Sequence, residues 1–423
     1  MCLLLVGLAD VRMRGVCLWS DHLEVHIETD RDAVGCWRCG SRAKGKGRRP
    51  VRLVDLPTFD RPVVLVWHKR RWQCPDRDCP VGSWTETDVR IAPPHGRMTT
   101  RAGRWATLRV GRDGRAVSEV AAELGCDWHT VMDAVTAYGR VLIDDPERIG
   151  PVSALGLDET LFARQGRFRT QAWSTSIVGL GRPAQLLDVI PGRNARRVSE
   201  WIDAQPEAWR DGIAWGVLDL SGPYRKTFND SLPDAIQIAD PFHVIKLANQ
   251  RLDECRRRTQ NETLGHRGHK DDPLFRSRRL LTKGAERLDT RGETRLLGLL
   301  EAGDPKGEVR MTWLAKEAVR SYYAHPDPDT AGELLDEIIC EFGSEHHPVE
   351  VQAMGGTLRR WRSQIAAWHQ ARTSNGPTEA INNLIKRIKR IGFGFRRFDH
   401  YRTRVLLYAG APNWDLLDQI TPP

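Results

Sequence analysis

The run Ile213-Ala214-Trp215-Gly216-Val217-Leu218-Asp219 is apolar, has the length of a strand and ends on a carboxylate. A short apolar run of this kind predicts a buried strand. Related patterns on either side predict further strands over 152–158, 169–180, 184–190 and 235–240. Helical periodicity separates these strands over 194–205 and 224–228, and a long helix is expected from Phe242 onward.

The order of these elements, three strands followed by alternating helices and strands, resembles the ribonuclease-H-like fold. Asp158 is expected to end the first strand and Asp219 the fourth. Because neighbouring strand ends converge in a mixed sheet, the two carboxylates should face each other. Mg²⁺ or Mn²⁺ would relieve their repulsion, since hard cations prefer carboxylate oxygens and keep waters for a phosphate. Two such ions support phosphodiester chemistry, and a third carboxylate normally completes the site.

Glu379 is the candidate third carboxylate. Ser374-Asn375-Gly376-Pro377-Thr378-Glu379 has the small polar residues and the proline of a helix start, and Gly392 is expected to end that helix. Lys386 lies two turns after Glu379 on the same face, where it could hold a DNA phosphate. Taken alone, Glu379 would be an ordinary acid at a helix N-terminus. The basic residues expected to contact DNA in this segment are Lys386, Arg387, Lys389, Arg390, Arg396 and Arg397.

Four of the nine cysteines form two close pairs, Cys36 with Cys39 and Cys74 with Cys79. Such pairs can hold one tetrahedral Zn²⁺ from two turns, and in a small β segment the metal would be structural. The alternative is four ordinary buried thiols. His68 is a spare ligand that strand geometry places on an exposed face instead.

Two further segments could contact DNA. Residues 116–125, a turn at 126–128 and a second helix from His129 fit a helix-turn-helix, with His129 and Thr130 on the reading helix; the alternative is a plain helical hairpin. The glycine-containing segment between the cysteine pairs is expected to be a loop, either solvated or bound to phosphates. Its candidate phosphate contacts are Lys44, Lys46, Arg48 and Arg49.

The composition indicates a globular protein and argues against a membrane or secreted protein. The 423 residues are 40% hydrophobic and 28% charged with a net charge of +9, which suits a globular protein with a polyanionic partner. No apolar run approaches the ~20 residues of a membrane helix, and the start lacks the basic leader of a secretory signal. Glu159 directly follows Asp158 and could share its role, whereas Asp188 and Asp253 are expected at the surface.

Several motifs together resemble bacterial insertion-sequence transposases of the zinc-finger-bearing ISL-three group, which are DDE transposases. The resemblance spans nearly the whole chain. It implies that Asp158, Asp219 and Glu379 form the metal-binding triad, and that a helical insertion precedes the glutamate. The motifs are the four cysteines, Val54-Asp55-Leu56-Pro57, Leu157-Asp158-Glu159, Asp219-Leu220-Ser221-Gly222-Pro223-Tyr224, Asp240-Pro241-Phe242-His243-Val244 and the segment from Ser374 to Glu379.

The resemblance also gives Asp240 and His243 an accessory role, either at the scissile phosphate or in placing a metal-bound water. The alternative is a helix-capping Asp with a structural His. The expected domains are a zinc-binding β module over 1–95, a helix-turn-helix domain over 96–148, a catalytic core over 149–260 and 373–423, and an all-α insertion over 261–372.

The expected function is that of a DNA transposase acting in the bacterial cytoplasm, at the nucleoid. It would bind the terminal inverted repeats of an insertion sequence, cut a strand to leave a 3′-OH and transfer that end to target DNA. A homo-oligomer is expected because two ends must be held together. Two alternatives remain: a non-catalytic zinc and helix-turn-helix DNA-binding regulator, and a structure-specific nuclease on the same fold.

Overall fold

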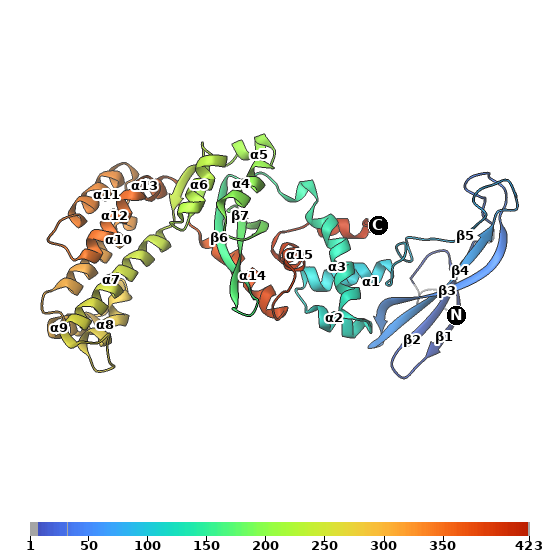
Figure 1. The fold of residues 1–423 in the computed structure, drawn as a ribbon, viewed down its shortest axis with the longest axis horizontal. Coiled ribbons are helices and arrows are strands. Elements are labelled where there is room, and N and C mark those ends of the chain that lie inside the picture. The colour runs from blue at the N-terminus through green and yellow to red at the C-terminus, as the bar shows by residue number, and fades with distance from the viewer. Residues whose placement is uncertain (1–6, 32, 422–423) are drawn as a thin grey trace.

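Two sheets and an intervening set of helices organise the chain, which a computed structural model describes for residues 7–31 and 33–421. The N-terminal sheet lies at one end of an elongated molecule, the second sheet near its middle and a helical lobe at the other end (Figure 1). Of the helices in these ranges, none combines the length and apolar composition that a membrane span needs.

The N-terminal sheet lies within residues 1–95, where a β module is expected. β3 and β4 pair antiparallel from Lys44 opposite Gln73 to Thr58 opposite Arg61, and β2 pairs only with the part of β4 before His68. The rest of the β3–β4 ribbon therefore projects beyond β1 and β2. The expected loop over 42–49 is wrong from Lys44 onward, because residues 44–49 form the first part of β3. The strands are β1 (Val11–Leu18), β2 (Leu23–Thr29), β3 (Lys44–Thr58), β4 (Arg61–Gln73) and β5 (Ser83–Thr85).

A short helical domain follows, with α1 (Thr100–Thr107), a π-helical turn (Leu108–Arg112), α2 (Val117–Leu124) and α3 (Trp128–Ile143). Gly125 ends α2 with a φ of 64°, a conformation that glycine adopts without steric cost. Asp127 caps α3 by accepting a hydrogen bond from the Thr130 amide at 3.0 Å. The predicted helix pair is therefore present, with the second helix beginning one residue earlier.

Asp55 joins the β module to this helical domain. Its side chain is 1% exposed and accepts hydrogen bonds from the Thr99 hydroxyl at 2.7 Å and from Arg101 Nε at 2.8 Å. The backbone of neighbouring Val54 also pairs with Arg97 and Thr99. A buried carboxylate needs such partners because burial removes its hydration.

The central sheet has the order β10-β9-β6-β7-β8, with β6, β9 and β10 parallel and β7 antiparallel to its neighbours. All five predicted strands are present. The expectation that Asp158 ends its strand is wrong, because β6 continues along its hairpin with β7 to Gln165. The strands are β6 (Ala154–Gln165), β7 (Thr170–Gly179), β8 (Gln185–Pro191), β9 (Trp215–Leu218) and β10 (Ile236–Ala239).

Helices cover both faces of this sheet, so its strands are apolar on both sides. Ile177 packs in one core with α4, α6 and α7, whereas its neighbour Val178 packs in a second core with α14, α15 and the helical domain. These helices are α4 (Ala195–Asp203), α5 (Glu207–Asp211), α6 (Gly222–Ser231), α7 (Pro241–Leu264), α14 (Gly376–Ile391) and α15 (Phe398–Ala409).

The helical lobe is the predicted insertion between α7 and α14. α7 runs unbroken across residues 260 and 261, so it carries the chain from the sheet into the lobe. α13 brings the chain back and packs against β10 (Figure 1). The helices are α8 (Pro273–Thr282), α9 (Thr290–Gly303), α10 (Glu308–Ala324), α11 (Pro328–Phe342), α12 (Val349–Arg360) and α13 (Arg362–Ala371).

Asp55→Asn removes the charge that faces Arg101 inside the junction of β3 and α1. We expect it to destabilise the protein by about 3 kcal/mol, the usual order for breaking a buried ion pair. Thermal unfolding followed by circular dichroism measures the effect. Asp60→Asn, at the exposed β3–β4 turn, is the matched control. Equal midpoints of thermal unfolding for the two variants would contradict the role given to Asp55.

Candidate functional site

Asp158 lies in the middle of β6 and is held from both sides. Its Oδ1 accepts the Glu159 amide at 2.7 Å, and its Oδ2 accepts Asn382 Nδ2 at 2.6 Å. Asn382 is 2% exposed and its Oδ1 lies 2.8 Å from the Ser176 hydroxyl. This network fixes the direction of the Asp158 carboxylate. Sequence reasoning missed Asn382, although its place one turn after Glu379 on an apolar helix face is the signal that could have identified it.

Asp219 directly follows β9 and is partly buried. Burial raises the pKa of Asp219, the facing His243 opposes that rise, and the charge of Asp158 adds to it. Its Oδ1 is buried and has no hydrogen-bond partner among the described residues. The next residue, Leu220, has a φ of 64°, a strained backbone conformation of the kind found at functional sites. The strands that carry the two aspartates are adjacent, since β6 and β9 pair in parallel with Gly156 opposite Val217.

Asp240 and His243 occupy the next strand end. Asp240 is 2% exposed; its Oδ2 lies 3.0 Å from His243 Nδ1, and its Oδ1 accepts the Asn375 amide at 2.8 Å. Although burial opposes it, the hydrogen bond to Asp240 raises the pKa of His243. Asp240 thus links the start of α7 to the start of α14, which carries Glu379.

Glu379 lies in the first turn of α14 and is exposed. This turn sits directly on β6, because a Cβ at Gly156 would lie 2.3 Å from the Thr378 hydroxyl oxygen. The side chain of Glu379 is not gathered with the two aspartates. In residues 7–31 and 33–421, the four cysteines are the one group of three or more potential ligands whose atoms all lie within 4.8 Å of one another.

Glu159 points to the opposite face of β6 from Asp158, toward Tyr224. Burial raises the pKa of Glu159, the charge of Arg193 lowers it, and the charges of Asp219 and Asp158 raise it. Glu159 therefore shares the electrostatic environment of the aspartates. In contrast, the expectation of a surface position for Asp188 is wrong: it is 7% exposed and binds Arg402 Nε at 2.7 Å and Trp201 Nε1 at 2.9 Å. The expectation for Asp253 holds only in part, because its side chain is 35% exposed and pairs with Arg256 and Arg257.

The four cysteines meet at the end of the β3–β4 ribbon. The sulfurs of Cys36 and Cys79 lie 3.8 Å apart and those of Cys39 and Cys74 lie 3.4 Å apart. Four thiolates around one Zn²⁺ at ~2.3 Å would be about 3.8 Å apart, so the cluster fits a tetrahedral metal. His68 is not part of it, since its Nε2 lies 3.1 Å from His26 Nδ1.

The start of the reading helix and the turn between α14 and α15 line one pocket of about 470 Å³. Trp128, His129, Arg396 and Arg397 all contribute to it, and in the same turn Phe393 is 96% exposed. Residues that are far apart in the sequence thus form one basic and aromatic surface. Thr130 does not join it: the residue is 8% exposed and its hydroxyl donates to Asp127, so its predicted DNA contact is withdrawn.

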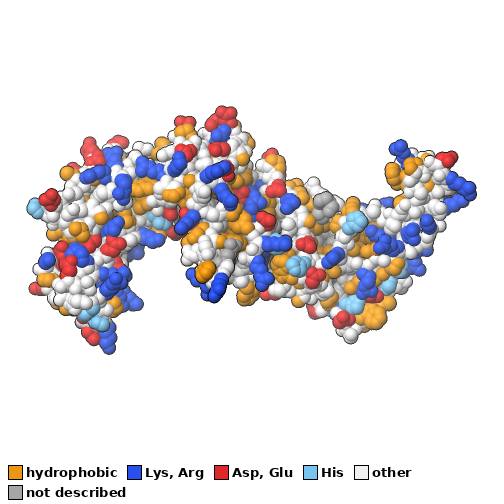
Figure 2. Space-filling model, viewed as in Figure 1, with side chains coloured by type: hydrophobic (Ala, Val, Ile, Leu, Met, Phe, Trp, Pro, Cys, Tyr) orange, Lys and Arg blue, Asp and Glu red, His pale blue; other side chains and the backbone are white. Residues whose placement is uncertain are grey.

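The other predicted DNA contacts are distributed over two surfaces. Lys386, Arg387 and Arg390 are exposed on α14. Lys389 is different: it is only partly exposed, it donates to the Leu161 carbonyl of β6, and burial lowers its pKa. On β3, Lys44, Lys46, Arg48 and Arg49 are all exposed, and Figure 2 shows Lys and Arg gathered at this end of the molecule.

Comparison with known proteins gives three family matches. Residues 155–405 match a family described as transposase, the DDE type of ISL3 elements. Residues 87–139 match the helix-turn-helix domain of transposase family ISL3, and residues 32–79 match the zinc-finger of transposase IS204/IS1001/IS1096/IS1165. The last match contains all four clustered cysteines and, with their geometry, indicates a structural zinc site.

Two curated relatives resemble the chain over most of its length. It is 23% identical over 396 residues to the transposase for insertion sequence element IS1001 of Bordetella parapertussis, with 90% of each chain covered. It is 28% identical over 389 residues to the transposase for insertion sequence element IS1557 of Mycobacterium tuberculosis, with 85% of this chain and 82% of the relative covered. These matches confirm the family that the sequence motifs indicate.

Metal analysis of the purified protein should give about one zinc per chain, since four thiolates complete one tetrahedral site. Cys74→Ser should lose that zinc and lower the midpoint of thermal unfolding, because the end of the ribbon has little apolar core of its own. Cys340→Ser, an exposed cysteine in the helical lobe, should change neither quantity. Full zinc content in Cys74→Ser would contradict the site.

Proposed function

Because this chain belongs to the ISL3 family of transposases, we propose that it cuts DNA at the ends of its insertion sequence and joins them to target DNA, with Asp158, Asp219 and Glu379 as the catalytic carboxylates. One observation carries the assignment. Asp158 and Asp219 are electrostatic neighbours on adjacent strands, and the helix that bears Glu379 lies against the strand of Asp158.

The strand order β10-β9-β6-β7-β8 supports a ribonuclease-H-like core. Three antiparallel strands, β6 to β8, precede two parallel strands that are added beside β6, and helices cover both faces. This arrangement supports a shared site, because β6 and β9 pair in parallel with Gly156 opposite Val217, and Asp158 and Asp219 each lie two residues further along, although 61 positions separate their numbers. Glu379 follows the helical insertion in the sequence and lies at the start of α14.

The residues present fit a hard divalent cation. Oxygen donors make up the site, the buried Asp219 Oδ1 has no hydrogen-bond partner among the described residues, and burial together with the charge of Asp158 raises the pKa of Asp219. When bound, Mg²⁺ or Mn²⁺ would supply the positive charge that favours ionised water as nucleophile and stabilises the leaving oxygen. Asn382 orients Asp158, and His243, held by Asp240, faces Asp219.

The proposed reaction has two steps. Water attacks a phosphodiester at the end of the element, and the bond to the 3′ oxygen breaks to leave a 3′-OH. That hydroxyl then attacks a phosphodiester of target DNA, so that one bond forms as another breaks and no covalent protein intermediate is needed. We propose a homo-oligomer, since two ends must be held together, acting at the chromosome in the bacterial cytoplasm.

Recognition of the ends is assigned to the composite surface of the reading helix and the α14–α15 turn. His129 lies in the first turn of the reading helix, and Arg396 and Arg397 extend the same pocket with positive charge. Recognition helices place their first turn against base edges in the major groove, while neighbouring arginines bind phosphates. The exposed side chains of β3 and α14 add phosphate contacts outside this pocket.

Asp219→Asn should retain binding to the element's ends but lower strand cleavage in Mg²⁺ by at least about a hundredfold, because the neutral amide cannot replace the carboxylate charge. Nicking of a plasmid that carries the element's ends measures cleavage, and a gel-shift assay measures binding. Asp211→Asn, at an exposed carboxylate at the end of α5, should cleave normally. Normal cleavage by Asp219→Asn would refute the triad.

Changing Arg396 and Arg397 together to Gln should weaken DNA binding and flatten its salt dependence. Each lost phosphate contact lowers the slope of log K against log salt by about 0.9. Fluorescence anisotropy of a labelled duplex over a series of salt concentrations gives this slope. Arg287→Gln, an exposed position in the helical lobe, is the control. An unchanged slope in the double variant would contradict the surface.

A further inference from the structure

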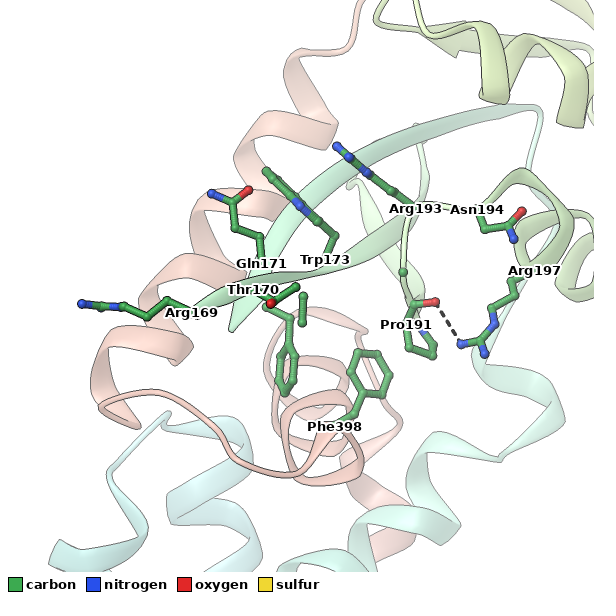
Figure 3. Close-up of a pocket in the computed structure, with 12 residues that line it drawn as sticks. Arg169, Thr170, Gln171, Trp173, Pro191, Arg193, Asn194, Arg197 and Phe398 are labelled. Carbon is green, nitrogen blue, oxygen red and sulfur yellow. Dashed lines mark hydrogen bonds between the residues drawn. The ribbon is translucent and has the colours of Figure 1, made fainter. Parts of the chain in front are cut away.

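A groove of about 980 Å³ lies beside the β6–β7 hairpin (Figure 3). β8 stops pairing at Ser174 of β7, so the preceding residues of β7 form an open edge. Side chains of this edge, of the β8–α4 turn and of α15 surround the groove. The residues that matter for its chemistry are Arg169, Trp173, Arg193, Asn194, Arg197 and Phe398.

The charge of the groove is entirely positive. Three arginines reach it from two different segments, and none of its lining residues, all within the described part of the chain, is acidic. Arg197 donates to the Pro191 carbonyl at 3.2 Å, which holds its guanidinium at the wall. Arginines held in this way bind phosphate oxygens, so the groove fits a polyanion.

An aromatic platform stands among these charges. Trp173 is half-exposed, and the Arg193 guanidinium carbon lies 5.4 Å from its ring centroid. Figure 3 shows both side chains on the same side of the hairpin. An indole beside a guanidinium is the combination that stacks nucleobases in single-stranded DNA sites. A paired duplex presents sugar and phosphate at its outside, not base faces.

The groove also adjoins the proposed catalytic residues. Trp173 pairs with Leu161 of β6, so its side chain lies on the face of the hairpin that carries Glu159, opposite to that of Asp158. At ~3.3 Å per residue, this rung is about 10 Å from Asp158 along the strand. The charge of Arg193 acts on Glu159, the neighbour of Asp158. A strand bound in the groove would thus lie within a few nucleotides of the carboxylates, on the Glu159 side of β6.

We propose that this groove holds an unpaired DNA strand next to the bond that is cut, with a base stacked on Trp173 and phosphates on Arg193 and Arg197. The inference rests on the proposed function and deepens it. It assigns to these three residues the separation of the strand end from its complement while the scissile phosphate lies at the carboxylates.

The test compares binding of two DNAs without added divalent metal: a fully paired duplex, and the same duplex with one end unpaired into single-stranded arms. 2-Aminopurine at successive positions of one arm reports base stacking by fluorescence quenching. The wild-type protein should prefer the forked DNA and quench one position. Trp173→Ala should lose the quenching and bind the forked DNA about tenfold more weakly, with paired binding unchanged.

Further variants test the same proposal if Trp173→Ala folds poorly. Trp173→Phe should retain most of the preference, and Arg193→Gln with Arg197→Gln should lower the salt slope on forked DNA by about 0.7 per contact. Arg196→Gln, on α4 but paired with Glu200, is the matched control.

Three outcomes would contradict the proposal that the groove binds an unpaired strand. These are quenching that persists in Trp173→Ala, equal loss of binding to both DNAs, and no preference for the forked DNA in the wild type. In each of these the wild type still binds paired DNA, which leaves the proposed function standing. A wild type that binds neither DNA would instead refute the proposed function together with the groove.

Discussion

The docking of α14 on β6 is the contact on which the proposed chemistry depends. Gly156 permits it, because any larger residue would collide with Thr378. Two polar contacts hold it: Asn382 binds Asp158 across 224 positions of sequence, and Asn375 binds Asp240 across 135. Both pairs are buried or nearly so, where hydrogen bonds to charged groups contribute about 1.5–3 kcal/mol. Without this docking, the helix that carries Glu379 would have no fixed place against β6.

The next helix, α15, connects the proposed DNA-reading surface to the central sheet. α15 packs on β8 on one side and on α3 on the other, and one continuous apolar core runs through all of them. The buried Arg404 of α15 donates to the Arg115 carbonyl just before α2 at 2.9 Å. A DNA end bound at the reading helix would therefore meet the carboxylates in a preset orientation, since close-packed cores transmit position with little slack.

The two ends of the molecule extend this rigid centre in different ways. The β module is joined through Asp55, a single buried carboxylate with partners on α1, and carries its basic side chains along a ribbon ended by the zinc site. The helical lobe is joined by α7, which leaves the sheet, and by α13, which returns along β10. Because α13 packs along β10, the chain leaves the helical lobe close to Asp240. The Asn375 amide can therefore donate a hydrogen bond to that carboxylate.

Local pattern was enough to predict the cysteine cluster, the helix pair around Gly125, the five strands of the central sheet and the family of the chain. These features depend on residue spacing and on apolar periodicity, which the sequence states directly. It could not predict that β6 continues past Asp158, that Asp188 is buried or that Lys389 turns back to Leu161, because each depends on a partner strand or helix remote in sequence. The sequence by itself thus determined the helices, the strands and the cysteine ligands, because these depend on local spacing. Only tertiary packing brought Asn382 into hydrogen-bonding distance of Asp158 and placed His129 and Arg397 in one pocket, because these residues are far apart in the sequence.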